Sequence, residues 1–214
     1  LGVIGAGVMG GGIAQVAAYH QIPVRLKDVV AEALTTGYQV AYQRFHERQR
    51  AGKLSSHEVS RRMALISPTL TYTGFGTADL VIESVVENLD VKRSVLSDIE
   101  NVTRPDTVIA TNTSSLTLSE MATSMKRPGR FVGLHFFNPV HRMPLVEVVC
   151  SELAEADAVG CALSFVHRLG KVPVKVADSP GFLVNRVLMP YLNEALLLVE
   201  SGVPTAQIDG ALKH

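Results

Sequence analysis

Short apolar runs and helical patterns alternate along the first 180 residues. Residues 1–4 are apolar and precede the glycine-rich run 5–10, after which residues 11–18 have a helical composition. Apolar positions then alternate along residues 22–28, which predicts a strand that ends in an acidic residue. Strand, glycine-rich turn, helix and strand follow one another in the order of a βαβ unit.

The polar segment 31–65 has a helical pattern that is interrupted at residues 51–55, which predicts a helical hairpin projecting from the sheet. Ser55 or Ser56 is placed to cap its second helix, with Glu58 in the first turn. We expect its charged side chains to form a solvated face, and contact with an acidic ligand is the alternative. These side chains are Arg44, Glu47, Arg48, Arg50, Lys53, Arg61 and Arg62.

Strand patterns recur further along the chain. Apolar and β-branched runs predict strands at 80–86, 107–111, 131–135, 145–149 and 172–176. Helical patterns at 90–101 and 155–169 separate them, and Thr117 with Glu120 fits a capping box for a further helix. Strands that alternate with helices indicate an α/β fold with a doubly wound, mostly parallel sheet.

Beyond residue 180 the pattern becomes purely helical. Apolar residues recur every three or four positions along 182–200, and another helix is predicted after Pro204. This predicts a first domain over residues 1–180, including the hairpin, and the beginning of an all-α domain over 181–214. Because the chain has no initiator methionine and ends without a helix stop signal, we expect a fragment of a longer protein.

The composition narrows the function classes. Of the 214 residues 47% are hydrophobic, enough for a core, and 20 basic side chains balance 20 acidic ones, which argues against binding to nucleic acid or an anionic membrane. No apolar run reaches the ~18 residues of a membrane helix, so no membrane insertion is predicted. Cys150 and Cys161 are too few for a disulfide framework. We expect them to be small core residues of a protein in a reducing compartment, the cytosol or an organelle matrix.

The glycine-rich run 5–10 is a candidate cofactor site because it follows a strand, opens a helix and is followed 18 residues after Gly10 by Asp28. In such a site Gly5 permits a tight turn, Gly7 lets the backbone approach a pyrophosphate, and Gly10 lets helix and strand pack closely. Asp28 would accept hydrogen bonds from a ribose diol, which favours NAD over NADP. The alternative is a glycine-rich turn without a ligand.

Three polar residues follow or end successive strands. Ser114 lies after the 107–111 strand, His135 ends the next one, and Glu147 lies on the strand after it. A buried histidine and a buried carboxylate are each costly alone, and a His135–Glu147 pair removes both costs and orients the imidazole as a general base. The alternatives are a packed structural histidine, a helix cap at Ser114, and pairing of Glu147 with Arg142 or a surface lysine. The remaining histidines, which include His214, show no metal-ligand spacing, so no metal is predicted.

Four motifs in order resemble the L-3-hydroxyacyl-CoA dehydrogenase family. They are Gly5-Ala6-Gly7-Val8-Met9-Gly10, Asn112-Thr113-Ser114-Ser115-Leu116, Gly133-Leu134-His135-Phe136-Phe137-Asn138-Pro139 and Asp178-Ser179-Pro180-Gly181-Phe182-Leu183-Val184-Asn185-Arg186. The resemblance covers essentially the whole chain and implies a Rossmann-type NAD-binding domain. The short hairpin and residues 208–214 are closest to the dehydrogenase part of multifunctional fatty-acid β-oxidation proteins.

The resemblance also implies residue roles. His135 would be the catalytic base with Glu147 as its partner, and Ser114 and Asn185 would hold the 3-oxygen of the substrate and the nicotinamide side of the site. Further cofactor contacts would come from Met9, Asp28, Val85, Val86, Glu87, Lys92, Asn112 and Asn138, beside the glycines and Ser114. The implied reaction is the reversible oxidation of (S)-3-hydroxyacyl-CoA to 3-oxoacyl-CoA by NAD, a step of fatty-acid β-oxidation.

The resemblance implies partners as well. The substrate would be an acyl-CoA thioester, and further C-terminal helices would form a homodimer or join the chain to a multifunctional β-oxidation complex. Two alternatives remain at this point: a dehydrogenase of 3-hydroxybutyryl-CoA or another 3-hydroxy acid, and a non-catalytic NAD-binding protein on the same fold.

Overall fold

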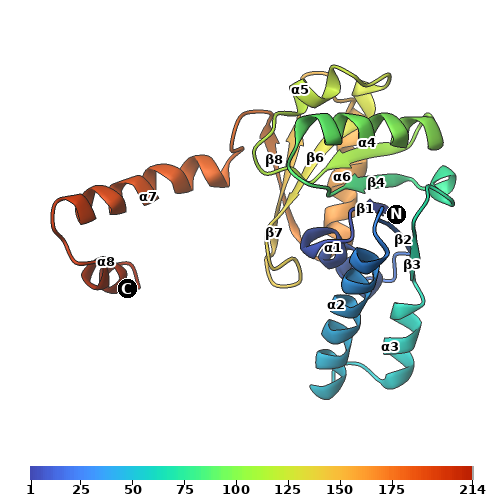
Figure 1. The fold of residues 1–214 in the computed structure, drawn as a ribbon, viewed down its shortest axis with the longest axis horizontal. Helices are drawn as coiled ribbons and strands as arrows, with labels where there is room; N and C mark the ends of the chain where they lie inside the picture. Colours follow the sequence, from blue (N-terminus) through green and yellow to red (C-terminus); the bar gives the residue numbers. More distant parts are fainter. Residues whose placement is uncertain (214) are drawn as a thin grey trace.

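The computed structural model describes residues 1–213 and contains an eight-stranded sheet between helices (Figure 1). The strand order is β3-β2-β1-β4-β5-β6-β7-β8, and neighbours are parallel except for β6 and β7. This confirms the mostly parallel α/β sheet. The strands are β1 (Gly2–Ile4), β2 (Val24–Lys27), β3 (Ile66–Thr69), β4 (Leu80–Glu83), β5 (Val108–Thr111), β6 (Phe131–Phe136), β7 (Leu145–Cys150) and β8 (Val172–Ala177).

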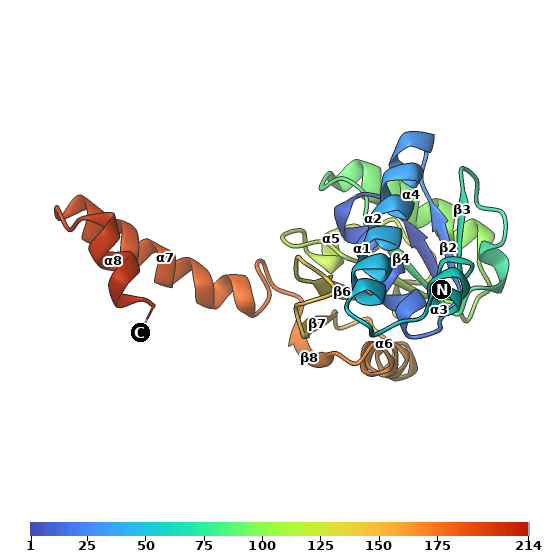
Figure 2. The same ribbon diagram turned by 90° about the horizontal axis from the view of Figure 1, so that it is seen from below.

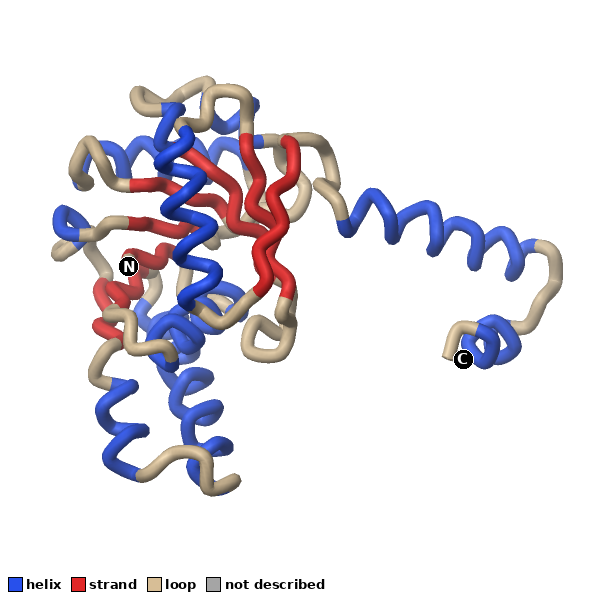
Figure 3. The backbone as a smooth tube through the Cα atoms, turned by 180° about the vertical axis from the view of Figure 1, so that it is seen from behind, coloured by secondary structure: helices blue, strands red, loops and turns tan. Residues whose placement is uncertain are grey.

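Apolar side chains from both faces of the sheet form two core layers. Successive residues of a strand point to opposite faces, so Val3 enters one layer and Ile4 the other. Helices α1, α2 and α6 contribute to the first layer, and α4 and α5 to the second; Figure 3 shows α6 lying across the strands. The helices are α1 (Val8–Tyr19), α2 (Ala31–Arg50), α3 (Ser56–Met63), α4 (Leu89–Val102), α5 (Leu118–Ala122), α6 (Ala156–Arg168), α7 (Val184–Glu200) and α8 (Thr205–Ala211).

The helices α2 and α3 form the predicted hairpin, which projects from the sheet (Figure 1). Ser55 caps α3: its Oγ accepts from the Glu58 amide at 3.2 Å, and the Ser55 amide donates to the Glu58 carboxylate at 2.8 Å. This reciprocal pair is a capping box, which fixes where α3 begins.

Thr117 is the N-cap residue of α5, but the predicted capping box does not form. The Thr117 hydroxyl donates to the Glu120 carboxylate at 2.7 Å instead of bonding to the backbone. The carboxylate of Asp178, 60 residues away in sequence, takes the cap and accepts the amides of Leu118 and Ser119 at 2.8 Å each. A distant side chain therefore outcompetes the local one.

Two further expectations need correction. Strand β3 was not predicted; it contains Pro68, which is tolerated because β3 lies at the edge of the sheet. Cys150 and Cys161 are half-buried rather than core residues. Even so, burial raises the pKa of both thiols.

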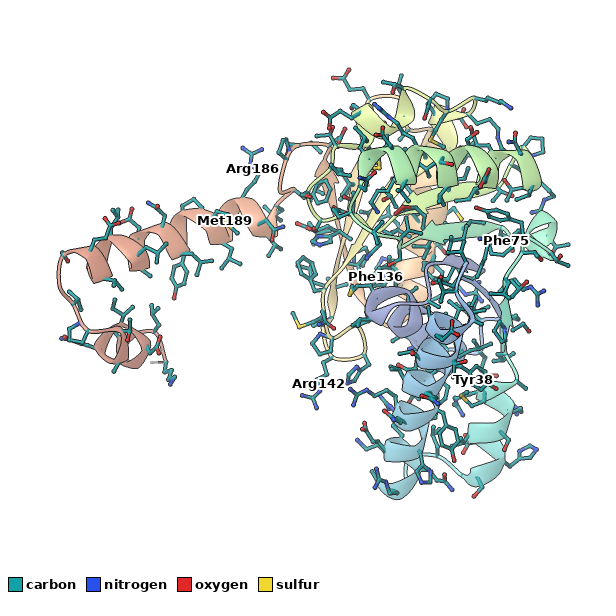
Figure 4. All side chains as sticks on the ribbon, viewed as in Figure 1. Tyr38, Phe75, Phe136, Arg142, Arg186 and Met189 are labelled. Atoms are coloured by element: carbon teal, nitrogen blue, oxygen red, sulfur yellow. The ribbon has the colours of Figure 1, made fainter. Side chains whose placement is uncertain are left out.

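Helices α7 and α8 extend away from the sheet (Figures 1 and 2). No residue of α7 is buried, although its sequence is largely apolar. Met189, which Figure 4 labels on this helix, is 57% exposed. Within residues 1–213, no helix combines the length and the apolar character needed to cross a membrane. His214, the last residue of the predicted all-α segment, lies outside the described residues.

Candidate active site

The candidate site is a cleft of about 540 Å³ at the carboxyl ends of β1, β4, β5 and β6. Ligands of doubly wound sheets bind at this edge, because the loops that follow the strands meet there. The cleft is lined by Gly7, Val8, Met9, Ser84, Val85, Val86, Glu87, Lys92, Asn112, Ser114, His135, Phe136, Phe137, Asn138 and Asn185.

The glycine-rich turn forms one end of the cleft. Gly5 has a φ of +92°, and a Cβ added there would lie 2.4 Å from the carbonyl oxygen of Ser84. At Gly7, in contrast, an added Cβ would meet nothing within 4 Å, so the backbone there borders open space. The first helical hydrogen bond of α1 runs from the Gly11 amide to the Gly7 carbonyl, which leaves the preceding amides of the first turn free. Open space beside a helix N-terminus fits a pyrophosphate.

Asp28 follows β2 but lies outside the lining of the cleft. Its carboxylate accepts the amides of Ala6 at 2.7 Å, Val29 at 2.7 Å and Val30 at 3.1 Å. Asp28 thus ties the glycine-rich turn to the end of β2. Sequence reasoning assigned it only to the ribose and did not foresee this structural contact.

His135 and Glu147 are opposite one another in the antiparallel pair β6–β7. Nδ1 of His135 lies 2.6 Å from Oε2 of Glu147; the histidine is 7% exposed and the glutamate fully buried. A carboxylate only accepts, so it places the imidazole proton on Nδ1 and leaves a lone pair on Nε2. Because His135 lines the cleft, this lone pair is available to a bound molecule.

The second oxygen of Glu147 holds the start of α7. Oε1 accepts the amides of Leu183 at 2.9 Å and Val184 at 2.8 Å, rather than pairing with Arg142. The turn before them is strained, since Phe182 has a φ of 48°. One buried carboxylate therefore orients the imidazole and anchors the helix on which Asn185 lies.

The loop after β5 places Ser114 at the cleft. Glu87 Oε1 accepts the amides of Ser114 at 3.0 Å and Ser115 at 3.3 Å, and also the Thr113 hydroxyl. The Asn185 amide group donates to the Ser114 carbonyl at 3.3 Å. The backbone of Ser114 is thus held from two sides while its side chain stays exposed.

A buried ion cluster lies beneath this loop. Lys92, 1% exposed, donates to both oxygens of the fully buried Glu83 at 2.5 and 3.1 Å and lies 3.3 Å from Glu87. Burial raises the pKa of Glu83. Burial would also raise the pKa of Glu87, but the Thr113 hydrogen bond and the Lys92 charge outweigh it and hold that pKa below its usual value. Sequence analysis missed Glu83, although an acid inside a β-branched strand was a signal.

Comparison with known protein families identifies the family of this chain. Residues 1–179 match the family described as 3-hydroxyacyl-CoA dehydrogenase, NAD binding domain. Residues 181–214 match the C-terminal domain of the same family. The chain belongs to the 3-hydroxyacyl-CoA dehydrogenase family. This confirms the resemblance stated from the four sequence motifs.

Similar proteins include larger members of this dehydrogenase family. A fatty acid oxidation complex subunit alpha of Psychrobacter arcticus is 43% identical over 99% of this chain, which spans 29% of that protein. The 3-hydroxybutyryl-CoA dehydrogenase of Escherichia coli K12 is 40% identical with a TM-score of 0.91, over 95% of this chain and 43% of its own. FadB2 of M. tuberculosis is 36% identical with a TM-score of 0.93, and the match covers 100% of this chain and 77% of FadB2.

The structure brings most of the expected dehydrogenase residues to one cleft. Most of the expected cofactor contacts line the cleft. Three lie outside its lining and support the glycine-rich turn instead: Gly5, Gly10 and Asp28. Asn112 also accepts the Phe136 amide at 2.9 Å and so ties the loop after β5 to the end of β6. Among residues 1–213, no group of three or more His, Cys, Asp or Glu side chains is placed to hold a metal ion.

Proposed function

We propose that this chain oxidises (S)-3-hydroxyacyl-CoA to 3-oxoacyl-CoA with NAD, in fatty-acid β-oxidation. The observation that carries the proposal is the buried His135–Glu147 pair at the edge of the cleft that begins at the glycine-rich turn. A base and its orienting carboxylate have no use in a protein that only binds a dinucleotide, which argues against the non-catalytic alternative.

The proposed mechanism assigns the proton to His135. Nε2 takes the proton of the 3-hydroxyl, and the Glu147 carboxylate stabilises the imidazolium that forms. NAD, when bound, supplies the hydride acceptor. Ser114 and Asn185, both on the cleft, would hold the 3-oxygen and the nicotinamide side of the site. General-base catalysis of this kind contributes about 10²–10⁴-fold.

The cofactor would lie along the cleft from Gly7 and Met9 to Asn138, past Val85, Val86, Glu87, Lys92 and Asn112. Asp28 would accept one hydroxyl of the ribose diol. A carboxylate offers about four lone-pair sites, and amides occupy three of those of Asp28, which leaves one for the ribose. Its charge would repel a 2′-phosphate, so we propose NAD rather than NADP.

A second, basic groove supports a CoA thioester. It lies between α2 and the loop 137–144 and is lined by Gln15, Arg44, Glu47, Arg48, Ala51, Lys53, His141 and Arg142. Figure 4 shows Arg142 at the end of this loop, on the side of α2. Four cationic side chains line this groove against the single carboxylate of Glu47, so its field is positive. Burial, and then the Arg44 charge, lower the pKa of His141. Since the whole chain has no net charge, such local cations would attract the CoA phosphates.

A substrate restricted to 3-hydroxybutyryl-CoA is a second candidate, because one similar structure, from E. coli, is a 3-hydroxybutyryl-CoA dehydrogenase. The catalytic residues would be the same for both substrates. Another 3-hydroxy acid is the remaining alternative, and the basic groove favours the thioester over it.

We also propose the organisation of the chain. Residues 1–180, with the hairpin 31–65, would form the NAD-binding domain, and 181–214 would begin a helical domain whose apolar α7 face meets a second copy or the rest of a multifunctional complex. The free thiols fit the bacterial cytosol, or an organelle matrix in a eukaryote.

The deciding experiment compares the chain with its His135→Gln variant. With acetoacetyl-CoA and NADH, we expect turnover to fall by about 10²–10⁴-fold while NADH affinity stays within about twofold. Turnover on free 3-hydroxybutyrate and on thioesters of increasing chain length would separate the three substrate candidates. Undiminished turnover in His135→Gln would refute the assignment of the base.

A further inference from the structure

The ion cluster Glu83–Lys92–Glu87 contains two carboxylates and one ammonium group. Lys92 lies between the carboxylates, 2.5 Å from Glu83 and 3.3 Å from Glu87. Full burial of both Glu83 and Lys92 is rare for such residues and costs desolvation energy. A hydrophobic pair of the same volume would often be as stable, so stability alone does not account for the cluster.

The position of the cluster relates it to the cofactor. Glu87 and Lys92 line the cleft, whereas Glu83 lies behind them on β4. Glu87 also holds the backbone of Ser114, which lies on the reacting side of the proposed site. Apart from these two residues and His135, none of the side chains that line the cleft is titratable or charged.

The cofactor changes charge in the reaction. The nicotinamide ring of NAD⁺ is a cation, and that of NADH is neutral. A bare Lys92 in this cleft would repel the oxidised form, because a charge in a partly buried site is weakly screened. Glu83 offsets that charge from behind, so the three groups together carry one net negative charge.

We propose that Glu83 is a charge-compensating residue, and that the net negative charge of the cluster Glu83–Lys92–Glu87 strengthens binding of NAD⁺ relative to that of NADH. The proposal rests on NAD as the cofactor. It adds that a residue outside the cleft sets the relative affinity of the two redox forms.

The test measures two dissociation constants in Glu83→Gln, by calorimetry for NAD⁺ and by cofactor fluorescence for NADH. The glutamine retains an acceptor for Lys92 and Thr111 but removes one charge. We expect NAD⁺ to bind about tenfold more weakly, because a unit charge in a partly buried site is weakly screened from the cationic ring. NADH should change by less than about twofold, since the neutral ring has no net charge to interact with.

Three further variants separate charge from geometry. Glu83→Gln combined with Lys92→Met restores the cluster charge, so the ratio of the two constants should return to the wild-type value even if both affinities fall. Thr111→Val removes a 3.1 Å hydrogen bond to Glu83 without removing charge and should leave the ratio unchanged. Glu87→Gln, at a partly exposed position, should lower the preference as Glu83→Gln does, and it tests the proposal if Glu83→Gln does not fold.

An unchanged ratio in both Glu83→Gln and Glu87→Gln would overturn the proposal while the dehydrogenase function stood. If the unsubstituted chain bound neither redox form, the assignment of NAD as the cofactor would itself be wrong.

Discussion

A Cβ added to Gly10 would lie 1.8 Å from the carbonyl oxygen of Gly5, whereas one added to Gly7 would meet nothing within 4 Å. Helix α1 and the turn that follows strand β1 thus touch backbone to backbone at Gly10. The two glycines of one motif have different tasks: Gly10 permits packing, and Gly7 borders the cleft.

Substitution of these glycines should separate folding from cofactor binding. Gly10→Ala should lower the free energy of unfolding by about 1–3 kcal/mol or more, because backbone atoms have to move. Gly7→Ala, at a φ of −66° that alanine accepts, should keep the melting temperature and weaken NADH binding. Thermal melts and fluorescence titrations measure both, and loss of stability in Gly7→Ala would contradict this division.

Glu147→Gln should impair the base without removing it. The glutamine amide can donate to Nδ1 of His135, which moves the imidazole proton to Nε2 and blocks proton uptake. We expect turnover to fall by about 10²–10⁴-fold. Hydrogen exchange at the Leu183 and Val184 amides should also become faster, since one oxygen of Glu147 binds both. Normal turnover with normal protection would show that this carboxylate has neither role.

Asp178→Ala should destabilise α5 from a distance. The loss of its bonds to the Leu118 and Ser119 amides should cost about 1–2 kcal/mol, as for other helix caps. Thr117→Ala is the matched control, because Thr117 makes no capping bond to the backbone, and should change stability by less than about 0.5 kcal/mol. Urea unfolding of both variants decides the matter, and the reverse order of effects would return the cap to Thr117.

The two thiols should react slowly with iodoacetamide. Burial raises the pKa of Cys150 and Cys161 above its usual value, so less thiolate is present at pH 8 than in a free cysteine. Alkylation followed by mass spectrometry should show rates well below that of a free thiol, which increase as the pH is raised past 9. Rates equal to the free thiol at pH 8 would mean that these side chains are solvated.

Local pattern and spacing were enough for most of the fold. The glycine-rich turn, the hairpin with its Ser55 cap and the strand that ends near His135 all depend on neighbouring residues, and the structure has each of them. The pairing of His135 with Glu147 was also foreseeable, since two costly buried groups on adjacent strands stabilise one another.

Long-range competition was not foreseeable. Asp178 displaces Thr117 as the cap of α5 only because the chain returns there after β8. The carboxylate of Asp28 accepts the amide of Ala6, 22 residues away, which no spacing rule indicates. Glu83 was hidden in a strand pattern, and its partner Lys92 lies nine residues away on α4. In each case the partner is fixed by tertiary structure rather than by sequence distance.

The antiparallel pairing of β6 with β7 makes the positions of His135 and Glu147 independent of the loop that joins the two strands. His135 and Glu147 are fixed by the hydrogen-bond ladder of the two strands, so the length and composition of the loop 137–144 do not determine their distance. That same loop borders the cofactor cleft at Phe137 and Asn138 and the basic groove at His141 and Arg142. Substitutions in this loop can therefore alter the cleft and the groove while the His135–Glu147 pair stays in place.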